Sequence, residues 1–549
     1  MCMRKSIEHV LSRVGGRGYG AYRELAGASA TMGGVRLEVV RVQPDPFAPP
    51  SIVRAEARIG LPKELLKYPV PVADYLHRAL REGLRRVSRK CGEGRSCELS
   101  VPRPGPVILR RSASRVVGDR AVFLVRVGLP SRRRRVLADE ARDTLLRRLP
   151  AAVEEAVRPD PARVREWVRA WLVQEGIRAR LRGEGLVSFV GDGSILPRAC
   201  GGCEEPLEGA VPFESPPSMR VELDLGDLGA FTGMGVPRGV TVIAGSAFHG
   251  KTTLAEAIAA GVWDHIPGDG RELVVTVREA MAVRSEDGRR VSCVDISPMI
   301  HDLPSGEDTA CFSTEDASGA TSLAAAIQEA VEAGADVLIL DEDTSATNML
   351  YSDPLGKKLT RWRTTTPIAE LARSMREHGV SLIIVSSGSS QLIAVADKVI
   401  LMEAYRPKDV TEEAKALIGL QPEEGEYRPP RPRVVAWFEP LEKPKVAAGR
   451  LQARNLRVPV DLVLNPHLVE ESQMITVAHL LARAGIVRDR GVKEVAEAVD
   501  ELMREGPAKV FGDRGGPNYS EVRGLDVVYA LNRLSTVRMV ARVGGRRPS

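Results

Sequence analysis

Residues 245–252 read Gly-Ser-Ala-Phe-His-Gly-Lys-Thr, which fits the phosphate-binding pattern G-x4-G-K-[ST]. A strand-like apolar run, VTVIA (240–244), precedes this stretch, and a helix-like run, TLAEAIAAGV (253–262), follows it. The glycines let the loop wrap tightly, so that its backbone N–H groups and the positive end of the helix dipole point at phosphate. The sequence therefore predicts a phosphate-binding loop (P-loop). The residues expected to bind ATP are Gly245, Ser246, Ala247, Phe248, His249, Gly250, Lys251, Thr252 and Thr253.

Two side chains of this loop and two later carboxylates have the chemistry that nucleotide hydrolysis needs. Lys251 is expected to reach the β- and γ-phosphates, and the Thr252 hydroxyl to ligate Mg²⁺. The apolar run VLIL (337–340) ends in Asp341 and Glu342. We predict that Asp341 holds Mg²⁺ through water and that Glu342 polarises the attacking water. Glu342 and Lys251 are then the catalytic residues, Mg²⁺ is the cofactor and ATP is the substrate.

The segment before these carboxylates narrows the class of P-loop protein. Ser318-Gly319-Ala320-Thr321 opens an expected helix 23 residues before Asp341, and this resembles the signature sequence of ABC ATPases. The following DTSATN (343–348) resembles their D-loop. A Ser-Gly pair at a helix start is often only an N-cap, so the spacing and the D-loop carry the argument. Ser318 to Thr321 would act on the ATP of a second chain, which predicts a homodimer.

Longer stretches resemble the family named "predicted ATPase of the ABC class". The resemblance spans nearly the whole chain and implies an α/β fold with a P-loop NTPase core of ABC-ATPase type. It also implies a mixed α+β N-terminal domain and a small α+β C-terminal domain, and some relatives are linked to RNA. The stretches are QPDPFAPPS (43–51), GDGSILPR (191–198), HGKTTL (249–254), GVWDHIPGDGRE (261–272), EDGRRV (286–291), VDISPMI (294–300), FSTEDASGATS (312–322) and DEDTSATN (341–348).

The chain departs from ordinary ABC ATPases at two places. The strand-like run 380–386 ends in Ser386-Ser387-Gly388, where transporter ATPases carry a switch histidine, and no glutamine stands at the usual Q-loop place near Ser297. The γ-phosphate must then be sensed differently, and turnover is expected to be slow. His249 or His265 could substitute, although we expect a hydrogen-bonded structural role for each.

Composition and charge divide the chain of 549 residues. Short apolar runs at 239–244, 273–277, 337–341 and 380–386 alternate with helical stretches, which predicts parallel strands. Residues 1–200 contain 39 Lys and Arg and 21 Asp and Glu, a net charge of +18, whereas the remainder carries −12. We predict a basic N-terminal domain (1–198), a linker (199–217), the ATPase core (218–425) and a C-terminal domain (434–549).

The basic third suggests a polyanionic partner, RNA or DNA. The alternative is that these arginines only form a solvated surface and bind no nucleic acid, because arginine is common throughout the chain. Few aromatic residues lie among these arginines, so stacking on unpaired bases is weakly supported. The side chains expected to contact phosphates are Arg85, Arg89, Arg132, Arg133, Arg134 and Arg135.

Two rival functions stay open, namely a nucleotide-dependent clamp or regulator with little hydrolysis, and the coupling subunit of a membrane transporter. No apolar run approaches the ~20 residues that cross a bilayer, and the first residues do not resemble a secretory signal. We therefore expect a cytoplasmic protein without membrane insertion. Seven cysteines are too few for a disulfide framework. Cys91, Cys97, Cys200 and Cys203 could bind a metal or form disulfides, but separate free thiols are the expectation.

Overall fold

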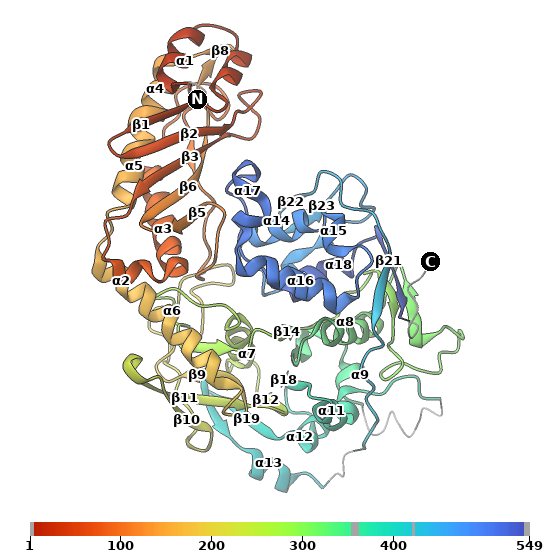
Figure 1. Ribbon diagram of the computed structural model, residues 1–549. Helices are drawn as coiled ribbons and strands as arrows, with labels where there is room; N and C mark the ends of the chain where they lie inside the picture. Colours follow the sequence, from red (N-terminus) through yellow and green to blue (C-terminus); the bar gives the residue numbers. More distant parts are fainter. Residues whose placement is uncertain (1–4, 353–358, 360–361, 420–422, 543–549) are drawn as a thin grey trace. The chain divides into compact units, whose positions relative to one another are not determined.

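The apolar run before the P-loop forms strand β12 (Val240–Ala244), which lies inside a six-stranded sheet (Figure 1). Its five residues are all buried, as expected for a parallel strand that is covered on both faces. The strand order is β14-β17-β18-β12-β19-β20, in which only the edge strand β20 runs antiparallel to its neighbour. The other strands are β14 (Ala280–Ala282), β17 (Val337–Asp341), β18 (Ser381–Val385), β19 (Lys398–Glu403) and β20 (Arg406–Asp409).

Residues 5–352, 359, 362–419 and 423–542 are described by this computed structural model. The chain divides into two compact units, the first made of Met1–Trp171 and Leu502–Glu521, the second of Leu172–Glu501 and Val522–Ser549. Helix α6 (Pro161–Leu181) begins in unit 1 and ends in unit 2. The predicted domain limits at 198, 217, 425 and 434 stay a prediction.

Helices connect the strands of this sheet. α7 (Lys251–Ala260) follows the P-loop and packs against β12, β17 and β18, whereas α11 (Ile368–Glu377) packs against β12 and β18. The helix that we expected to open at Ser318-Gly319 is present as α8 (Gly319–Ala333). The shorter helices of this region are α9 (Thr347–Leu350), α12 (Ser390–Val395) and α13 (Thr411–Leu417).

A second sheet of unit 2 is antiparallel, with the order β10-β11-β9-β13. The run 273–277, which we expected to join the parallel sheet, forms β13 here, with Val274 opposite Val190 of β9. That expectation was wrong because a short apolar run shows burial but not its partner strand. The strands are β9 (Leu186–Gly191), β10 (Arg220–Asp224), β11 (Ala230–Pro237) and β13 (Val274–Thr276).

Unit 1 is built on an antiparallel sheet with the order β1-β2-β3-β6-β4, in which β5 also pairs with β6. Helix α5 packs against β2 and β3, while α3 packs against β5 and α5. The elements are α1 (Ile7–Val14), β1 (Ser29–Met32), β2 (Val35–Arg41), β3 (Ser51–Arg58), α2 (Lys63–Leu66), α3 (Pro69–Val87), β4 (Leu99–Ser100), β5 (Ser114–Val117), β6 (Arg120–Val127), β7 (Ser131–Arg132), β8 (Arg135–Val136), α4 (Ala138–Asp143), α5 (Leu149–Ala156) and α17 (Pro507–Gly515).

The C-terminal part of unit 2 packs onto the core that carries the P-loop. The buried His467 accepts a hydrogen bond from the backbone N–H of Ala282, and its carbonyl accepts one from the indole of Trp263. Burial lowers the pKa of His467 to about 3, so its ring is neutral and can accept this bond. The elements of this part are β21 (Arg433–Phe438), β22 (Lys445–Ala447), β23 (Arg450–Gln452), β24 (Val460–Asp461), α14 (Glu471–Leu480), α15 (Ala484–Val487), α16 (Val492–Arg504), α18 (Gly524–Leu531) and β25 (Val537–Ala541). Earlier in the chain, β15 (Val291–Val294) and β16 (Phe312–Thr314) form a two-stranded sheet, and β15 packs against β25.

Candidate nucleotide-binding site

The P-loop joins β12 to α7, and two of its glycines are fixed by backbone geometry. Gly245 has φ 136°, and a Cβ atom placed there would lie 2.5 Å from the carbonyl oxygen of Met402. Gly250 has φ 93° and is the N-cap of α7. Both conformations favour glycine, which explains why the pattern needs glycine at these two places. The loop ends at the N-terminus of α7, where the helix dipole favours an anion.

Lys251 and Thr252 occupy the first turn of α7. The Lys251 ammonium donates hydrogen bonds to the carbonyl oxygens of Gly245 (2.6 Å) and Ser246 (2.9 Å), so the cation lies against the loop itself. The Thr252 side chain is exposed at the helix start. Both groups therefore lie where phosphate oxygens and a hydrated cation could contact them.

The P-loop is also held to the β19–β20 turn. His249 accepts a hydrogen bond through Nδ1 from the backbone N–H of Ala404, at 3.1 Å. This contact gives His249 a hydrogen-bonded structural role, as expected from the sequence. His265 pairs with Asp269 at 2.7 Å, and both side chains are buried.

Asp341 is the last residue of β17 and Glu342 follows it. The parallel neighbour of β17 is β18, which lies beside β12. Parallel strands end at the same edge of a sheet, so the carboxylates and the P-loop share that edge. Asp341 Oδ1 accepts a hydrogen bond from the backbone N–H of Asp343 at 3.0 Å. The sheet therefore brings together the P-loop and both predicted carboxylates.

Glu342 is the most heavily hydrogen-bonded of the predicted site residues. Its Oε1 accepts a bond from the Tyr351 hydroxyl (2.6 Å), and its Oε2 accepts from Ser386 Oγ (3.0 Å), Ser387 N (2.8 Å) and Ser387 Oγ (3.0 Å). Burial alone would raise the pKa of Glu342, but these four bonds outweigh burial and hold its pKa below the ordinary value. The bond to Glu342 raises the pKa of Tyr351 to about 12.

Ser386 and Ser387 occupy the place where transporter ATPases carry a switch histidine. Both bond to Glu342 from the end of β18, so this place in the chain does contact the predicted catalytic carboxylate. The sequence showed that the switch histidine is absent. It did not predict that Tyr351, Ser386 and Ser387 would donate hydrogen bonds to Glu342. A pair of hydroxyl residues after an apolar strand was the available signal.

The signature residues lie at the start of α8, with Ser318 as its exposed N-cap. Ser318 Oγ accepts a bond from the backbone N–H of Thr321 (3.3 Å) and lies 3.0 Å from Thr321 Oγ1. A Cβ atom at Gly319 would lie 3.0 Å from Asp287 Oδ1. Ser318 thus bonds within the first turn of its own helix, and its exposed N-terminus is a surface that phosphate could approach.

The four consecutive arginines form the tip of a hairpin in unit 1. β7 and β8 pair through Ser131–Val136 and Arg132–Arg135, and the two central residues have positive φ (48° and 56°), as in a type I′ turn. All four side chains are exposed. Arg134 lies 3.6 Å from Asp45, and Arg135 donates to the carbonyl oxygen of Gly16 at 3.0 Å.

Arg85 near the end of α3 and Arg89, two residues beyond that helix, have carboxylate partners. Arg85 pairs with Glu82 at 3.3 Å, and Arg89 pairs with Glu140 and with Asp143. These partners reduce the positive potential that the two arginines present to a phosphate. The hairpin tip is therefore the more strongly cationic of the two predicted contact surfaces.

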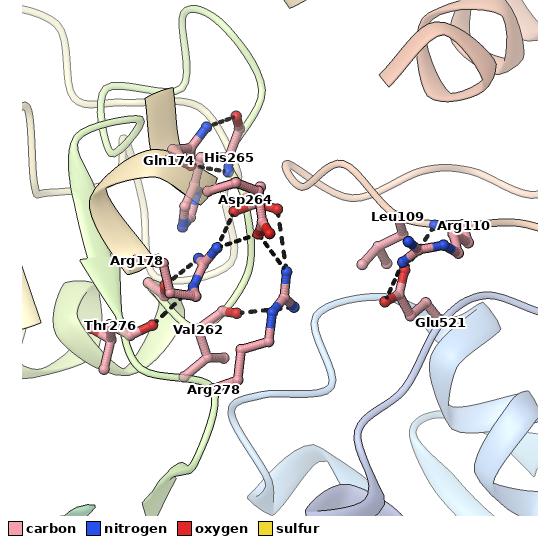
Figure 2. A network of polar contacts seen from close by, with 12 residues as sticks. Leu109, Arg110, Gln174, Arg178, Val262, Asp264, His265, Thr276, Arg278 and Glu521 are labelled. Atoms are coloured by element: carbon pink, nitrogen blue, oxygen red, sulfur yellow. Dashed lines mark hydrogen bonds and ion pairs between the residues drawn. The ribbon is translucent and has the colours of Figure 1, made fainter. Parts of the chain in front are cut away.

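A buried ion network that the sequence did not reveal lies after α7 (Figure 2). Arg178 of α6 and Arg278 both approach the buried Asp264, at 2.6 Å and 3.4 Å. Burial raises the pKa of Asp264, and the two guanidinium groups act against that rise. Gln174 donates to the carbonyl oxygen of His265 at 2.9 Å. These contacts fix the chain between α7 and β13.

The cysteines correct our expectation of free thiols. Three disulfides are present among the described residues, Cys91–Cys97, Cys200–Cys203 and Cys293–Cys311. The paired sulfurs carry no thiolate and are not available as zinc ligands. The expectation failed because spacing alone does not tell whether two cysteines approach within disulfide range.

Across the part of the chain that is described, no helix combines the length and the hydropathy required to cross a membrane.

Two family models match the chain. The P-loop domain model of the ABC ATPase family matches residues 160–435, and the model described as "ATPase of the ABC class N-terminal" matches residues 4–160. A curated relative, the uncharacterized protein MJ1628 of Methanocaldococcus jannaschii, is 32% identical over 248 residues. That match covers 43% of this chain and 54% of the relative, so the chain spans about half the length of the curated relative it matches.

Two solved structures are also similar over part of the chain. One is the ADP conformation of MJ1267, an ATP-binding cassette of an ABC transporter, at 11% identity and a TM-score of 0.26, covering 42% of this chain and 94% of that chain. The other is an inward-facing conformation of an ABC transporter described as of metal-chelate type. It is 14% identical with a TM-score of 0.25, and the match covers 41% of this chain and 82% of that chain.

Proposed function

This chain belongs to the ATPases of the ABC class, and we propose that it binds ATP with Mg²⁺ and hydrolyses it to ADP and phosphate. The observation that carries this proposal is the shared sheet edge. The P-loop follows β12, whereas Asp341 and Glu342 stand at the end of β17. Both strands run parallel, with β18 between them. A phosphate held by the P-loop would then lie beside the two carboxylates.

The donor groups present fit Mg²⁺ and a triphosphate. Thr252 supplies a hydroxyl oxygen and Asp341 a carboxylate oxygen, which are the hard ligands that Mg²⁺ prefers. Bound Mg²⁺ would neutralise charge on the phosphate oxygens. The Lys251 ammonium, which bonds to two carbonyl oxygens of its own loop, would exchange these for phosphate oxygens.

Glu342 would orient and polarise the water that attacks the γ-phosphorus. The new bond joins the water oxygen to phosphorus, the bond from phosphorus to the bridging oxygen breaks, and ADP leaves with the electron pair. The proton of the water passes to the carboxylate and then to the phosphate that is released. A carboxylate whose pKa lies below its ordinary value is ionised at neutral pH, but it is a weak base, so we expect slow turnover.

The composite site would need a second copy of the chain. Ser318 to Thr321 form an exposed helix N-terminus whose hydrogen bonds stay within its own first turn. We propose that this N-terminus contacts the γ-phosphate of the ATP held by the other protomer. Two nucleotides would then lie between the two copies.

The basic N-terminal domain would bind RNA or DNA. Residues 1–200 carry a net charge of +18, and the exposed hairpin tip at 132–135 presents four guanidinium groups. Arginine suits this role because its planar fork can bond to two phosphate oxygens. Closure of the nucleotide sandwich would change the grip on the nucleic acid.

One observation favours a second candidate, a nucleotide-dependent clamp with little hydrolysis. Both oxygens of Glu342 are occupied by hydrogen bonds from Tyr351, Ser386 and Ser387. A carboxylate that keeps these bonds while ATP is bound would not accept a proton from water. The two candidates differ in the rate of phosphate release and not in the binding of ATP.

Phosphate release and ATP binding, measured on the same preparations, test the proposal. Wild type should release phosphate, Glu342→Gln should bind ATP and lose at least about a hundredfold in rate, and Lys251→Ala should lose binding. Glu377→Gln, at the exposed end of α11, is the matched control and should behave as wild type. Unchanged release in Glu342→Gln would remove this carboxylate from the mechanism, and release absent from wild type that binds ATP would favour the clamp.

A further inference from the structure

Cys91, Cys97 and Glu140 come together in unit 1. One ligand atom from each side chain, the two sulfurs and a carboxylate oxygen, lie within 4.8 Å of one another. The cysteines belong to the loop between α3 and β4, and Glu140 belongs to α4. Cys97 is buried, whereas Cys91 and Glu140 are partly exposed. Within the described residues, no other three side chains of His, Cys, Asp or Glu are close enough to hold one metal ion.

The loop that carries the two cysteines is fixed by hydrogen bonds that do not involve sulfur. Its backbone bonds to the neighbouring segments at Pro46 and at 128–131. The Cα atoms of Cys91 and Cys97 are 5.7 Å apart. Because these bonds would persist after the disulfide is opened, the two sulfurs would stay close enough to share one ion. The bonds run from Glu93 N–H to Ser131 O (3.0 Å), from Arg95 N–H to Pro46 O (3.2 Å) and from Cys97 N–H to Gly128 O (2.8 Å).

Thr144 and Arg89 hold the third side chain beside the sulfurs. The Thr144 hydroxyl lies 2.7 Å from the carbonyl oxygen of Glu140 and 3.3 Å from Cys97 Sγ, so it joins α4 to the cysteine loop. Arg89 pairs with Oε2 of Glu140, which orients the carboxylate and leaves its second oxygen for a ligand. Groups that orient ligand side chains in this way commonly surround metal ions in proteins.

We propose that reduction of the Cys91–Cys97 disulfide creates a site for a borderline-soft divalent ion, Zn²⁺, held by both sulfurs and by Glu140. While the disulfide is closed, the sulfurs are bonded to each other and have no thiolate to offer. Two sulfurs and one carboxylate oxygen suit Zn²⁺, which is four-coordinate and would complete its shell with water. Mg²⁺ and Ca²⁺ prefer oxygen ligands throughout, so they should not compete.

The step balances with a thiol as the reductant. Two thiol molecules give two electrons and two protons to the disulfide, which becomes two cysteine thiols, and the reductant leaves as its own disulfide. Zn²⁺ then displaces the two thiol protons and binds the thiolates. Because the bound ion occupies both sulfurs, it should also slow their return to a disulfide.

The other two disulfides separate this geometry from cysteine spacing. Cys200 and Cys203 have the C-x2-C spacing that is common in zinc sites, but no third ligand side chain lies within range among the described residues. The same holds for Cys293 and Cys311. Reduced Cys200 and Cys203 should therefore bind Zn²⁺ more weakly, which makes this pair the internal control.

Metal titration of the full chain tests the proposal. The chain is reduced with a phosphine, which takes up the oxygen of a water molecule, and the reductant is then removed under argon. Reduced wild type should take Zn²⁺ from a chromogenic chelator, and its Co²⁺ form should show the sulfur-to-cobalt charge-transfer band. The oxidised chain should do neither. The band requires a sulfur ligand, so ions at the proposed Mg²⁺ site do not contribute to it.

Variants of the ligands and their neighbours locate the ion. Glu140→Gln should weaken Zn²⁺ by at least about tenfold, because it removes the oxygen ligand. Asp139→Asn, at a side chain that is 97% exposed, is the matched control and should bind as wild type. Cys91→Ser should lose the binding that competes with the chelator, whereas Cys200→Ser with Cys203→Ser should keep it.

Four results would overturn the site. One is a Cys91–Cys97 disulfide that the phosphine leaves closed in the folded chain, as shown by thiol alkylation. Another is a reduced wild type without the charge-transfer band. Equal Zn²⁺ affinity in wild type and Glu140→Gln would remove the third ligand, and loss of binding in Cys200→Ser with Cys203→Ser would place the ion at that pair. These outcomes do not depend on ATP binding, so this proposal is tested separately from the proposed function.

Discussion

At the scale of single residues, the hydrogen bonds on Glu342 decide how the site should respond to pH. Its folded-state pKa lies below the ordinary value because Tyr351, Ser387 and Ser386 together outweigh burial. If the ionised carboxylate is needed for turnover, the acid limb of the pH–rate profile follows this pKa. Removing a donor raises the pKa, so the acid limb must move to higher pH.

We therefore predict that Tyr351→Phe and Ser387→Ala each shift the acid limb of the ATPase profile upward in pH. The measurement is phosphate release across the acid range, at saturating ATP. Ser389→Ala is the matched control, because Ser389 caps α12 without a side-chain bond and should leave the profile in place. A downward shift, or no shift, in both test variants would show that Glu342 does not set the acid limb.

The candidate site could be predicted from the sequence only where its residues lie close together in the chain. The P-loop is one run of eight residues between a strand and a helix, and Asp341-Glu342 follows a run of apolar residues. The partners of Glu342 come from 9, 44 and 45 residues away. No local pattern carries such contacts, because they depend on how β17 and β18 pair.

At the scale of elements, α8 and α18 meet through buried charges. Arg533, two residues after α18, bonds to Glu286 through Nε at 2.9 Å, lies over the ring of Tyr529 and approaches Glu329 of α8 at 3.9 Å. Arg289 pairs with Glu329 of α8 at 2.9 Å. All four charged side chains of these pairs are at most 7% exposed. The helix that begins with the signature residues is thus fixed by a charged layer.

Replacing Arg533 by Met should destabilise the fold by about 3–5 kcal/mol, because Glu286 is left buried without its cation. The matched control is Arg542→Met, which breaks the exposed pair with Glu494 and should cost about 0–1 kcal/mol. Denaturant unfolding measures both values. Equal losses in the two variants would mean that the buried layer contributes no more than a surface pair.

The same pair predicts a dependence on pH. Arg533 is the main cause that holds the pKa of Glu286 below its ordinary value, against the effect of burial. The stabilisation is therefore present above the ordinary glutamate pKa and is lost as pH falls through the folded-state value. The stability difference between wild type and Arg533→Met should shrink in that acid range.

The sequence predicted individual elements better than their partners. The helix expected to open at Ser318 is present as α8, and the apolar runs before the P-loop and before Glu342 form β12 and β17. The orientation of β13 was wrong, and the three disulfides were missed. Both errors have one cause. The pairing of strands and the pairing of cysteines depend on which residues meet in space, and the periodicity of the sequence does not show this.

At the scale of the whole molecule, the charge asymmetry predicts binding of nucleic acid that weakens with salt. Each phosphate contact should contribute about 0.7–0.9 log units of affinity per tenfold change in salt. Changing Arg132 to Arg135 into Ser should flatten this slope, while ATP hydrolysis without nucleic acid stays near that of wild type. Sequence preference should be weak, because phosphate contacts position a protein without specifying bases.

A matched variant tests whether the effect belongs to the hairpin tip at 132–135 or to any loss of positive charge. Arg85→Ser with Arg89→Ser removes two cations that are already paired with carboxylates and should change the slope less. Filter binding at several salt concentrations, with single- and double-stranded probes, measures both slopes. If neither probe binds at low salt, with or without ATP, the basic N-terminal domain does not bind nucleic acid and its arginines form only a charged surface.

The central claim is that Mg-ATP is held between two copies of this chain, and light scattering of the Glu342→Gln variant tests it most directly. Slow turnover should trap the closed state, so the 59.5 kDa chain should give a species of twice that mass with saturating Mg-ATP and revert without nucleotide. Adding Ser318→Arg, which blocks the exposed start of α8, should keep the variant monomeric while ATP still binds. A 59.5 kDa species that persists when the P-loop is saturated with Mg-ATP would contradict the account.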